Sequence, residues 1–72
     1  MKRLEIVCDV AGKVWKVAAP PGTRVARDDP VVILESMKME IPVAAPRDGT
    51  ITELRVREGD AVAEGDVIGV LD

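Results

Sequence analysis

The chain has 72 residues and a formal net charge of −3, with 10 basic and 13 acidic side chains spread along its length. This length allows one domain, in which folding buries only about 60% of the surface. Proteins that bind nucleic acid use clustered cations and aromatic stacking platforms, whereas Trp15 is the only aromatic residue here. No apolar stretch reaches the roughly 18 residues of a membrane span. We therefore expect neither a nucleic acid partner nor a membrane partner.

Valine and isoleucine dominate the apolar residues, and short apolar runs alternate with turn residues. The valines, isoleucines and leucines number 12, 5 and 4, and β-branched residues favour strands. Five prolines and six glycines interrupt every candidate helix. We predict an all-β chain with eight strands, in chain order at residues 3–8, 13–18, 24–26, 31–35, 40–44, 50–56, 61–63 and 67–71.

Cys8, in the first predicted strand, is the only cysteine, so no internal disulfide can form. It continues the apolar alternation of Ile6 and Val10, which favours a packed position over a reactive one. No signal-peptide apolar region follows Met1. These features favour a reducing cytoplasm, and a strand directly after Met1 favours a free-standing or subunit-terminal domain.

Acidic residues gather in three of the predicted turns, and they raise the question of a calcium site. The turns contain Asp28-Asp29, Glu58-Gly59-Asp60 and Glu64-Gly65-Asp66. Their spacing does not match the EF-hand loop, which alternates its ligands and closes with a distal glutamate. We interpret them as tight hairpin turns and expect no metal site.

The second half of the chain repeats the first with an offset of 37 residues and no gaps. Residues 12–35 align with residues 49–72, and the six identical pairs are Gly12/Gly49, Gly22/Gly59, Val25/Val62, Ala26/Ala63, Asp29/Asp66 and Leu34/Leu71. The repeated positions are turn glycines and core-facing apolar residues. We predict two halves related by a pseudo-twofold axis, because neither half alone has enough apolar residues for a core. Trp15 aligns with Thr52, and we expect it half-exposed on an outer face.

Lys38 lies between two methionines, in the run Glu35-Ser36-Met37-Lys38-Met39-Glu40. Apolar runs on both sides, at residues 31–34 and 41–43, predict a hairpin with this lysine at its tip. A soluble domain gains nothing from exposing two methionines, whereas methionine gives adaptable apolar contact to a binding partner. The run therefore indicates a lysine presented for modification by another protein.

This run resembles the attachment site of the biotinyl/lipoyl attachment domains, whose biotinyl branch carries Met-Lys-Met around the modified lysine. The resemblance covers about residues 10–72 and extends to biotin carboxyl carrier domains and small biotin/lipoyl attachment proteins. It implies a flattened eight-strand β-barrel or sandwich, the barrel-sandwich hybrid. Residues 1–72 would form a single biotinyl domain, with the attachment hairpin at residues 35–40 and its turn opposite the chain termini.

The resemblance implies a carrier and not an enzyme, with no catalytic residues. A biotin protein ligase would join biotin by an amide to the Lys38 ε-amine, supplying both the activated acyl donor and the base. A biotin carboxylase would then carboxylate the cofactor, and the domain would carry carboxybiotin to a carboxyltransferase. We expect Met37 and Met39 to be recognised by the ligase or by these partners, together with Glu35, Ser36 and Glu40.

Several alternatives remain open at this stage. Lipoyl domains usually have an acidic residue directly before the lysine, so Met37 favours biotin. Lipoate on Lys38 is the second candidate cofactor, either in place of biotin or in a dual attachment protein that accepts both. Many biotinyl domains have alanine where Ser36 stands, which is a small-for-small change. Glu35 and Glu40 could instead be solubilising charges. A different class of function is an unmodified structural adaptor, in which Lys38 is an ordinary exposed lysine. The chain lacks histidine and has a single cysteine, which leaves little for an enzyme active site.

Overall fold

The computed structural model describes residues 3–72, in which all regular secondary structure is β-strand. The strands are β1 (Leu4–Val7), β2 (Gly12–Val17), β3 (Arg24–Val25), β4 (Pro30–Ser36), β5 (Met39–Ala44), β6 (Gly49–Leu54), β7 (Ala61–Val62) and β8 (Val67–Leu71). The all-β prediction and all eight predicted strands are confirmed.

The predicted boundaries agree with the structure to within two residues. Pro30 is the first residue of β4, where the missing proline N–H interrupts no ladder inside the strand. Residues 55 and 56 were assigned to a strand, but β6 ends at Leu54. Its pairing with β8 ends at the same residue, opposite Gly69.

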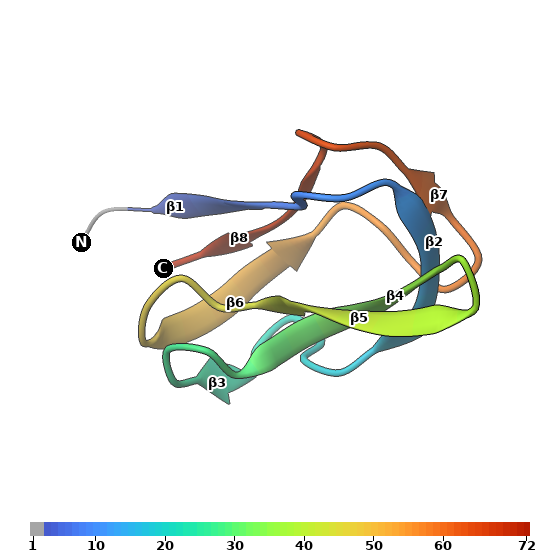
Figure 1. Ribbon diagram of the computed structural model, residues 1–72. Coiled ribbons are helices and arrows are strands. Elements are labelled where there is room, and N and C mark those ends of the chain that lie inside the picture. Colours follow the sequence, from blue (N-terminus) through green and yellow to red (C-terminus); the bar gives the residue numbers. More distant parts are fainter. Residues whose placement is uncertain (1–2) are drawn as a thin grey trace.

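The strands form two four-stranded antiparallel sheets, with strand orders β1-β8-β6-β3 and β5-β4-β2-β7 (Figure 1). The offset of 37 residues exchanges the two sheets strand for strand. It carries β1 onto β5, β2 onto β6, β3 onto β7 and β4 onto β8. The predicted pseudo-twofold relation is therefore confirmed, and the two halves of the chain contribute to both sheets. Each sheet then covers the apolar face of the other.

The repeat extends to a distortion of the strands. Pairing between β2 and β4 shifts between Val14 and Lys16, and pairing between β6 and β8 shifts between Ile51 and Glu53, 37 residues later. Each shift is a β-bulge, in which two residues oppose one on the partner strand. Trp15 lies in the first bulge and is 49% exposed, as expected for an outer-face position.

The hydrophobic core lies between the sheets and draws on both halves. Its fully buried side chains include Ile6, Val14, Val31, Val32, Leu34, Ile51, Ile68 and Leu71. Cys8 is also buried, and its Sγ donates a hydrogen bond to the carbonyl oxygen of Ala63 at 2.9 Å. The expectation that this thiol is packed is confirmed.

The body is elongated, with extents of 36 × 17 × 17 Å. The hairpin that joins β4 to β5 lies at one end of the long axis, whereas β1 begins and β8 ends toward the other end (Figure 1). Residues 3–72 contain no helix that could cross a membrane. The fold therefore leaves the β4–β5 turn free of the chain ends.

Candidate functional site

The hairpin between β4 and β5 closes with a turn of only two residues, Met37 and Lys38. Ser36 pairs with Met39 directly before and after it. Both turn residues have positive φ, 52° at Met37 and 64° at Lys38. Positive φ at both positions defines a type I′ turn, which matches the twist of the strands and normally selects Asn-Gly. Two bulky side chains thus hold a left-handed backbone that neither of them favours.

The strands below the turn hold this strained backbone in place. Leu34 is fully buried and pairs on one side with Val14 of β2 and on the other with Ile41 of β5. Because β4 is a central strand with partners along both edges, the hairpin is an extension of the core and not a loose loop. The tip therefore stands in a fixed direction, along the body's long axis.

The tip itself is in water. Met37 is 90% exposed and Met39 is 59% exposed, and Lys38 is also exposed. Within residues 3–72 the Lys38 amine forms neither a hydrogen bond nor an ion pair. Two exposed methionines beside a free amine form a short apolar surface around a nucleophile. Met37 does not pack against the body, whereas Met39 is partly covered.

Three charged residues lie side by side across neighbouring strands, one residue further from the turn than Ser36 and Met39. Glu35 lies opposite Glu40 of β5 and, on its other side, opposite Lys13 of β2. All three are exposed, and none of them forms an ion pair in residues 3–72. Ser36, next to the turn, is half-buried. The five residues expected around Lys38 are thus brought together at the hairpin, and Lys13 joins them from a strand that the sequence did not connect to the site.

The acidic turns have structural partners. Asp29, Asp60 and Asp66 each accept a hydrogen bond from the backbone N–H three residues earlier, at 2.8–3.0 Å. Residues 3–72 contain no cluster of three or more metal-ligating side chains. These carboxylates therefore stabilise turns, as interpreted from the sequence.

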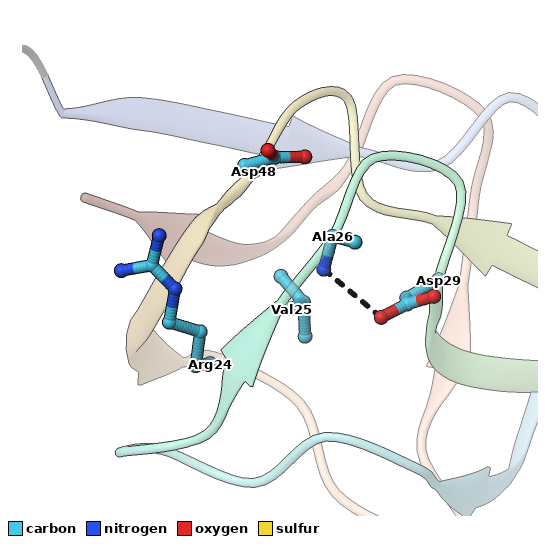
Figure 2. A pocket seen from close by; sticks show the side chains of 5 residues that line it. All are labelled: Arg24, Val25, Ala26, Asp29 and Asp48. Atoms are coloured by element: carbon cyan, nitrogen blue, oxygen red, sulfur yellow. Dashed lines mark hydrogen bonds between the residues drawn. The ribbon is translucent and has the colours of Figure 1, made fainter.

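A shallow surface hollow lies beside β3. Figure 2 shows that it is lined by Arg24, Val25, Ala26, Asp29 and Asp48. The Asp29 carboxylate accepts a hydrogen bond from the Ala26 N–H. Asp48 likewise accepts a hydrogen bond from the Arg27 N–H at 2.7 Å. Both carboxylates hold backbone in place, and the hollow contains no nucleophile.

Comparison with known proteins identifies the class. The family model described as "Biotin-requiring enzyme" matches residues 5–71. The chain is 45% identical over 65 residues to the biotin/lipoyl attachment protein of Bacillus subtilis, covering 90% of this chain and 89% of that protein. It is 46% identical over 63 residues to the alpha3 subunit of the biotin-dependent acyl-coenzyme A carboxylase of Mycobacterium leprae, covering 88% of this chain and 10% of that subunit. The chain belongs to the biotin/lipoyl attachment domain family.

Solved structures agree with this assignment. The urea carboxylase of Kluyveromyces lactis matches with a TM-score of 0.93 and 30% identity, over 100% of this chain and 6% of that one. The lipoyl domain of the 2-oxoglutarate dehydrogenase complex of Azotobacter vinelandii matches with a TM-score of 0.71 and 36% identity, over 88% of this chain and 80% of that one. The chain is thus a cofactor-attachment domain similar to the carrier regions of carboxylases, and it spans a small part of the large carboxylases it matches.

Sequence reasoning missed two features of this region. The strain of the turn could have been inferred from its length, because a two-residue hairpin needs positive φ at residues that are here not glycine. The bulge at Trp15 carries no comparable signal in a single strand. Its signal lies in the repeat, in which Trp15 and Thr52 stand at the same position of both halves.

Proposed function

We propose that this chain is a biotin carboxyl carrier, and that Nζ of Lys38 is the point of covalent attachment. The observation that carries the proposal is the free amine of Lys38 at the tip of a core-anchored hairpin, between two exposed methionines and opposite the termini (Figure 1). Under this proposal residues 1–72 form one biotinyl domain, with residues 35–40 as its attachment hairpin.

The residues of the hairpin suit attachment of a long acyl group. Nothing in residues 3–72 covers Nζ, so an amide formed there projects away from the body. In the attachment reaction the Nζ lone pair attacks the activated carboxyl of biotinyl-adenylate, the amide bond forms and AMP leaves. The amine proton passes to a base of the ligase, because no carboxylate of residues 3–72 contacts Nζ.

The chain's own contribution to transfer is position. Bound biotin supplies a ureido nitrogen that accepts and releases a carboxyl group. Lys38 holds that group on a tether, which raises its effective concentration at each active site it visits. A biotin carboxylase would load the tethered group, and a carboxyltransferase would unload it. Relatives that are named carboxylases support this role, and the lone buried cysteine fits a reducing cytoplasm.

Lipoate is the second candidate cofactor. The similarity to a lipoyl domain and to a protein named for both cofactors supports it. Met37 argues for biotin, since lipoyl domains usually carry an acidic residue at that position. In either case the mechanism of tethered transfer from Lys38 is the same. Both similarities argue against the remaining alternative, an unmodified structural adaptor.

The proposal is tested by carboxyl loading of the modified protein. Wild-type protein isolated from its native host should incorporate labelled bicarbonate when ATP and the host's biotin carboxylase are present. Lys38→Arg keeps the charge but should incorporate none, whereas Arg24→Lys, the reverse exchange at an exposed residue of β3 on the other sheet, should incorporate as much as wild type. Loading of Lys38→Arg at the wild-type level would disprove the proposed site.

A further inference from the structure

The outer faces of the two sheets occupy equivalent positions in the repeat but differ in chemistry. On the sheet of β1, β8 and β6, four charged side chains form three ion pairs of 2.8–3.7 Å: Arg3, Glu5, Glu53 and Arg55. The offset of 37 residues carries them onto Glu40, Pro42, Lys16 and Ala18. These lie in or directly after strands of the sheet of β5, β4, β2 and β7, which contains the Lys38 hairpin and is called the hairpin sheet below. Among residues 3–72, the face that carries Lys38 therefore has no ion-pair network equivalent to that of its counterpart.

Apolar side chains lie on this face instead, with Trp15 and Pro42 exposed and Ile33 partly exposed. Ile33 of β4 pairs with Pro42 on one side and with the bulge of β2 on the other. Lys16 pairs with Ile33, and Trp15 is the extra residue of the bulge directly before it. Both are exposed whereas Val14 is buried, so the indole lies on the outer side of the sheet. We call Trp15, Ile33 and Pro42 the Trp15 patch. Trp15 is 49% exposed, whereas Thr52 at the equivalent position donates a hydrogen bond to the Val70 carbonyl at 3.3 Å.

The rim of the patch is charged and unpaired. Lys13 and Lys16 flank Trp15 along β2, and both are exposed without an ion pair in residues 3–72. Glu35 and Glu40 lie on the side of the hairpin tip, also without ion pairs. An apolar centre with an aromatic anchor and an unpaired polar rim is the usual composition of a protein-binding surface.

The patch is close to Lys38 and on the outer face of the sheet of β5, β4, β2 and β7. Pro42 lies four residues along β5 from Lys38, which is about 13 Å at 3.3 Å per residue. The inner face of the sheet packs against the other sheet, where Leu34 and Val14 are fully buried. A protein that closes over Lys38 from this side must therefore meet the Trp15 patch.

We propose that the Trp15 patch is a docking surface for the biotin protein ligase, an inference that rests on the proposed function. Before modification the reacting amine is only a lysine side chain away from the backbone. The ligase must therefore bring its active site up to the body of the domain, whereas enzymes that act on the finished arm can work at a greater distance. Its surface would offer an apolar recess to the indole and carboxylates to Lys13 and Lys16.

The repeat supplies substitutions that the fold already accepts. Trp15→Thr places on the hairpin sheet the residue found in the equivalent bulge, and Lys16→Glu does the same with the residue of position 53. With unmodified protein, biotin, ATP and the host's ligase, Trp15→Thr should raise the KM for the carrier about tenfold or more, with kcat and the melting temperature near wild type. Lys16→Glu should raise the same KM, and high salt should shrink its effect.

The matched control is Val7→Thr on β1, because Val7 is 48% exposed but lies on the other sheet. It should leave the KM unchanged. An unchanged KM in folded Trp15→Thr would overturn the docking proposal while leaving Lys38 as the attachment site. A raised KM for the biotin carboxylase alone, or self-association that Trp15→Thr abolishes, would assign the patch to another occupant and overturn it too. Failure of the wild type to be modified at Lys38 would remove the proposed function itself.

Discussion

Glu35 and Glu40 lie directly opposite each other across the β4–β5 hairpin, one residue further from the turn than the pair Ser36 and Met39. Two like charges in this position repel each other, and neither has an ion-pair partner in residues 3–72. The repulsion therefore destabilises the hairpin, and this pair of charges is expected if a binding partner recognises one or both carboxylates.

Glu40→Gln should accordingly stabilise the protein. Removing one of the two charges should raise the free energy of unfolding by a few tenths of a kcal/mol at low salt. The gain should shrink at high salt, because salt screens exposed charges. Urea denaturation at two ionic strengths measures both effects. Glu58→Gln, in an exposed turn, serves as the control and should change little; equal stabilisation by both variants would show that the cross-strand pairing is not the cause.

The backbone of the turn gives a second prediction. Met37 has a φ of 52° in a type I′ turn, and asparagine adopts this conformation more readily. Met37→Asn should raise the free energy of unfolding by about 0.5–1 kcal/mol and at the same time slow modification of Lys38. Met39→Asn, at a residue of β5, should slow modification without a gain in stability. Stabilisation of both variants, or of neither, would argue against strain at the turn.

Two glycines of the second half should respond differently to alanine. Gly59 has a φ of 95° and open space around an added Cβ, so Gly59→Ala should cost about 1–2 kcal/mol through the backbone alone. At Gly49 an added Cβ would lie within hard contact of the Asp72 carbonyl oxygen and the Leu71 side chain. Gly49→Ala should therefore cost more than Gly59→Ala. Thermal or urea unfolding of the pair gives the order, and the reverse order would contradict the packing described for the end of β8.

The stabilisation from the ion pairs on the sheet of β1, β8 and β6 should depend on pH. The Arg55 guanidinium donates a hydrogen bond of 2.8 Å to Glu53 and, with its charge, lowers the pKa of that carboxyl below the ordinary 4.5. A lowered pKa stabilises the fold above the ordinary value, and the stabilisation is lost as the pH falls through the folded-state pKa.

Arg55→Met should therefore be less stable than wild type at pH 7, and the difference should shrink as the pH falls below about 4.5. Urea unfolding across this range is the measurement. Arg57→Met is the control, because the Arg57 side chain forms no ion pair in residues 3–72. A difference between wild type and Arg55→Met that stays constant with pH would contradict the role given to Glu53.

Much of the fold could be predicted from the sequence because the same pattern of turns and strands occurs in both halves of the repeat. Gly22 and Gly59 stand 37 residues apart, and both have positive φ, as turn chemistry requires. Leu34 and Leu71 also repeat and are both fully buried. Aligned glycines and aligned apolar residues therefore located the turns and the strands without knowledge of the sheets.

The exceptions lie where the two halves differ. Asp28 has a φ of 75° at the position that Gly65 fills in the second half, and aspartate is a weaker sign of a left-handed backbone than a pair of aligned glycines. Lys13 lies opposite Glu35 because β2 and β4 are neighbours in the sheet, and the pattern within each strand does not predict which strands pair. For the site, the sequence predicted the lysine and its neighbours along the chain, but not the face that lies beside them.

The measurement that tests the central claim most directly is the intact mass of the protein from its native host, followed by peptide mapping of residues 35–40. We predict the mass of one biotinyl group, located on Lys38 and absent from Lys38→Arg. A lipoyl group on Lys38 would move the carrier to another class of transfer reaction. Unmodified Lys38 in native material, or a group attached to another lysine, would contradict the account.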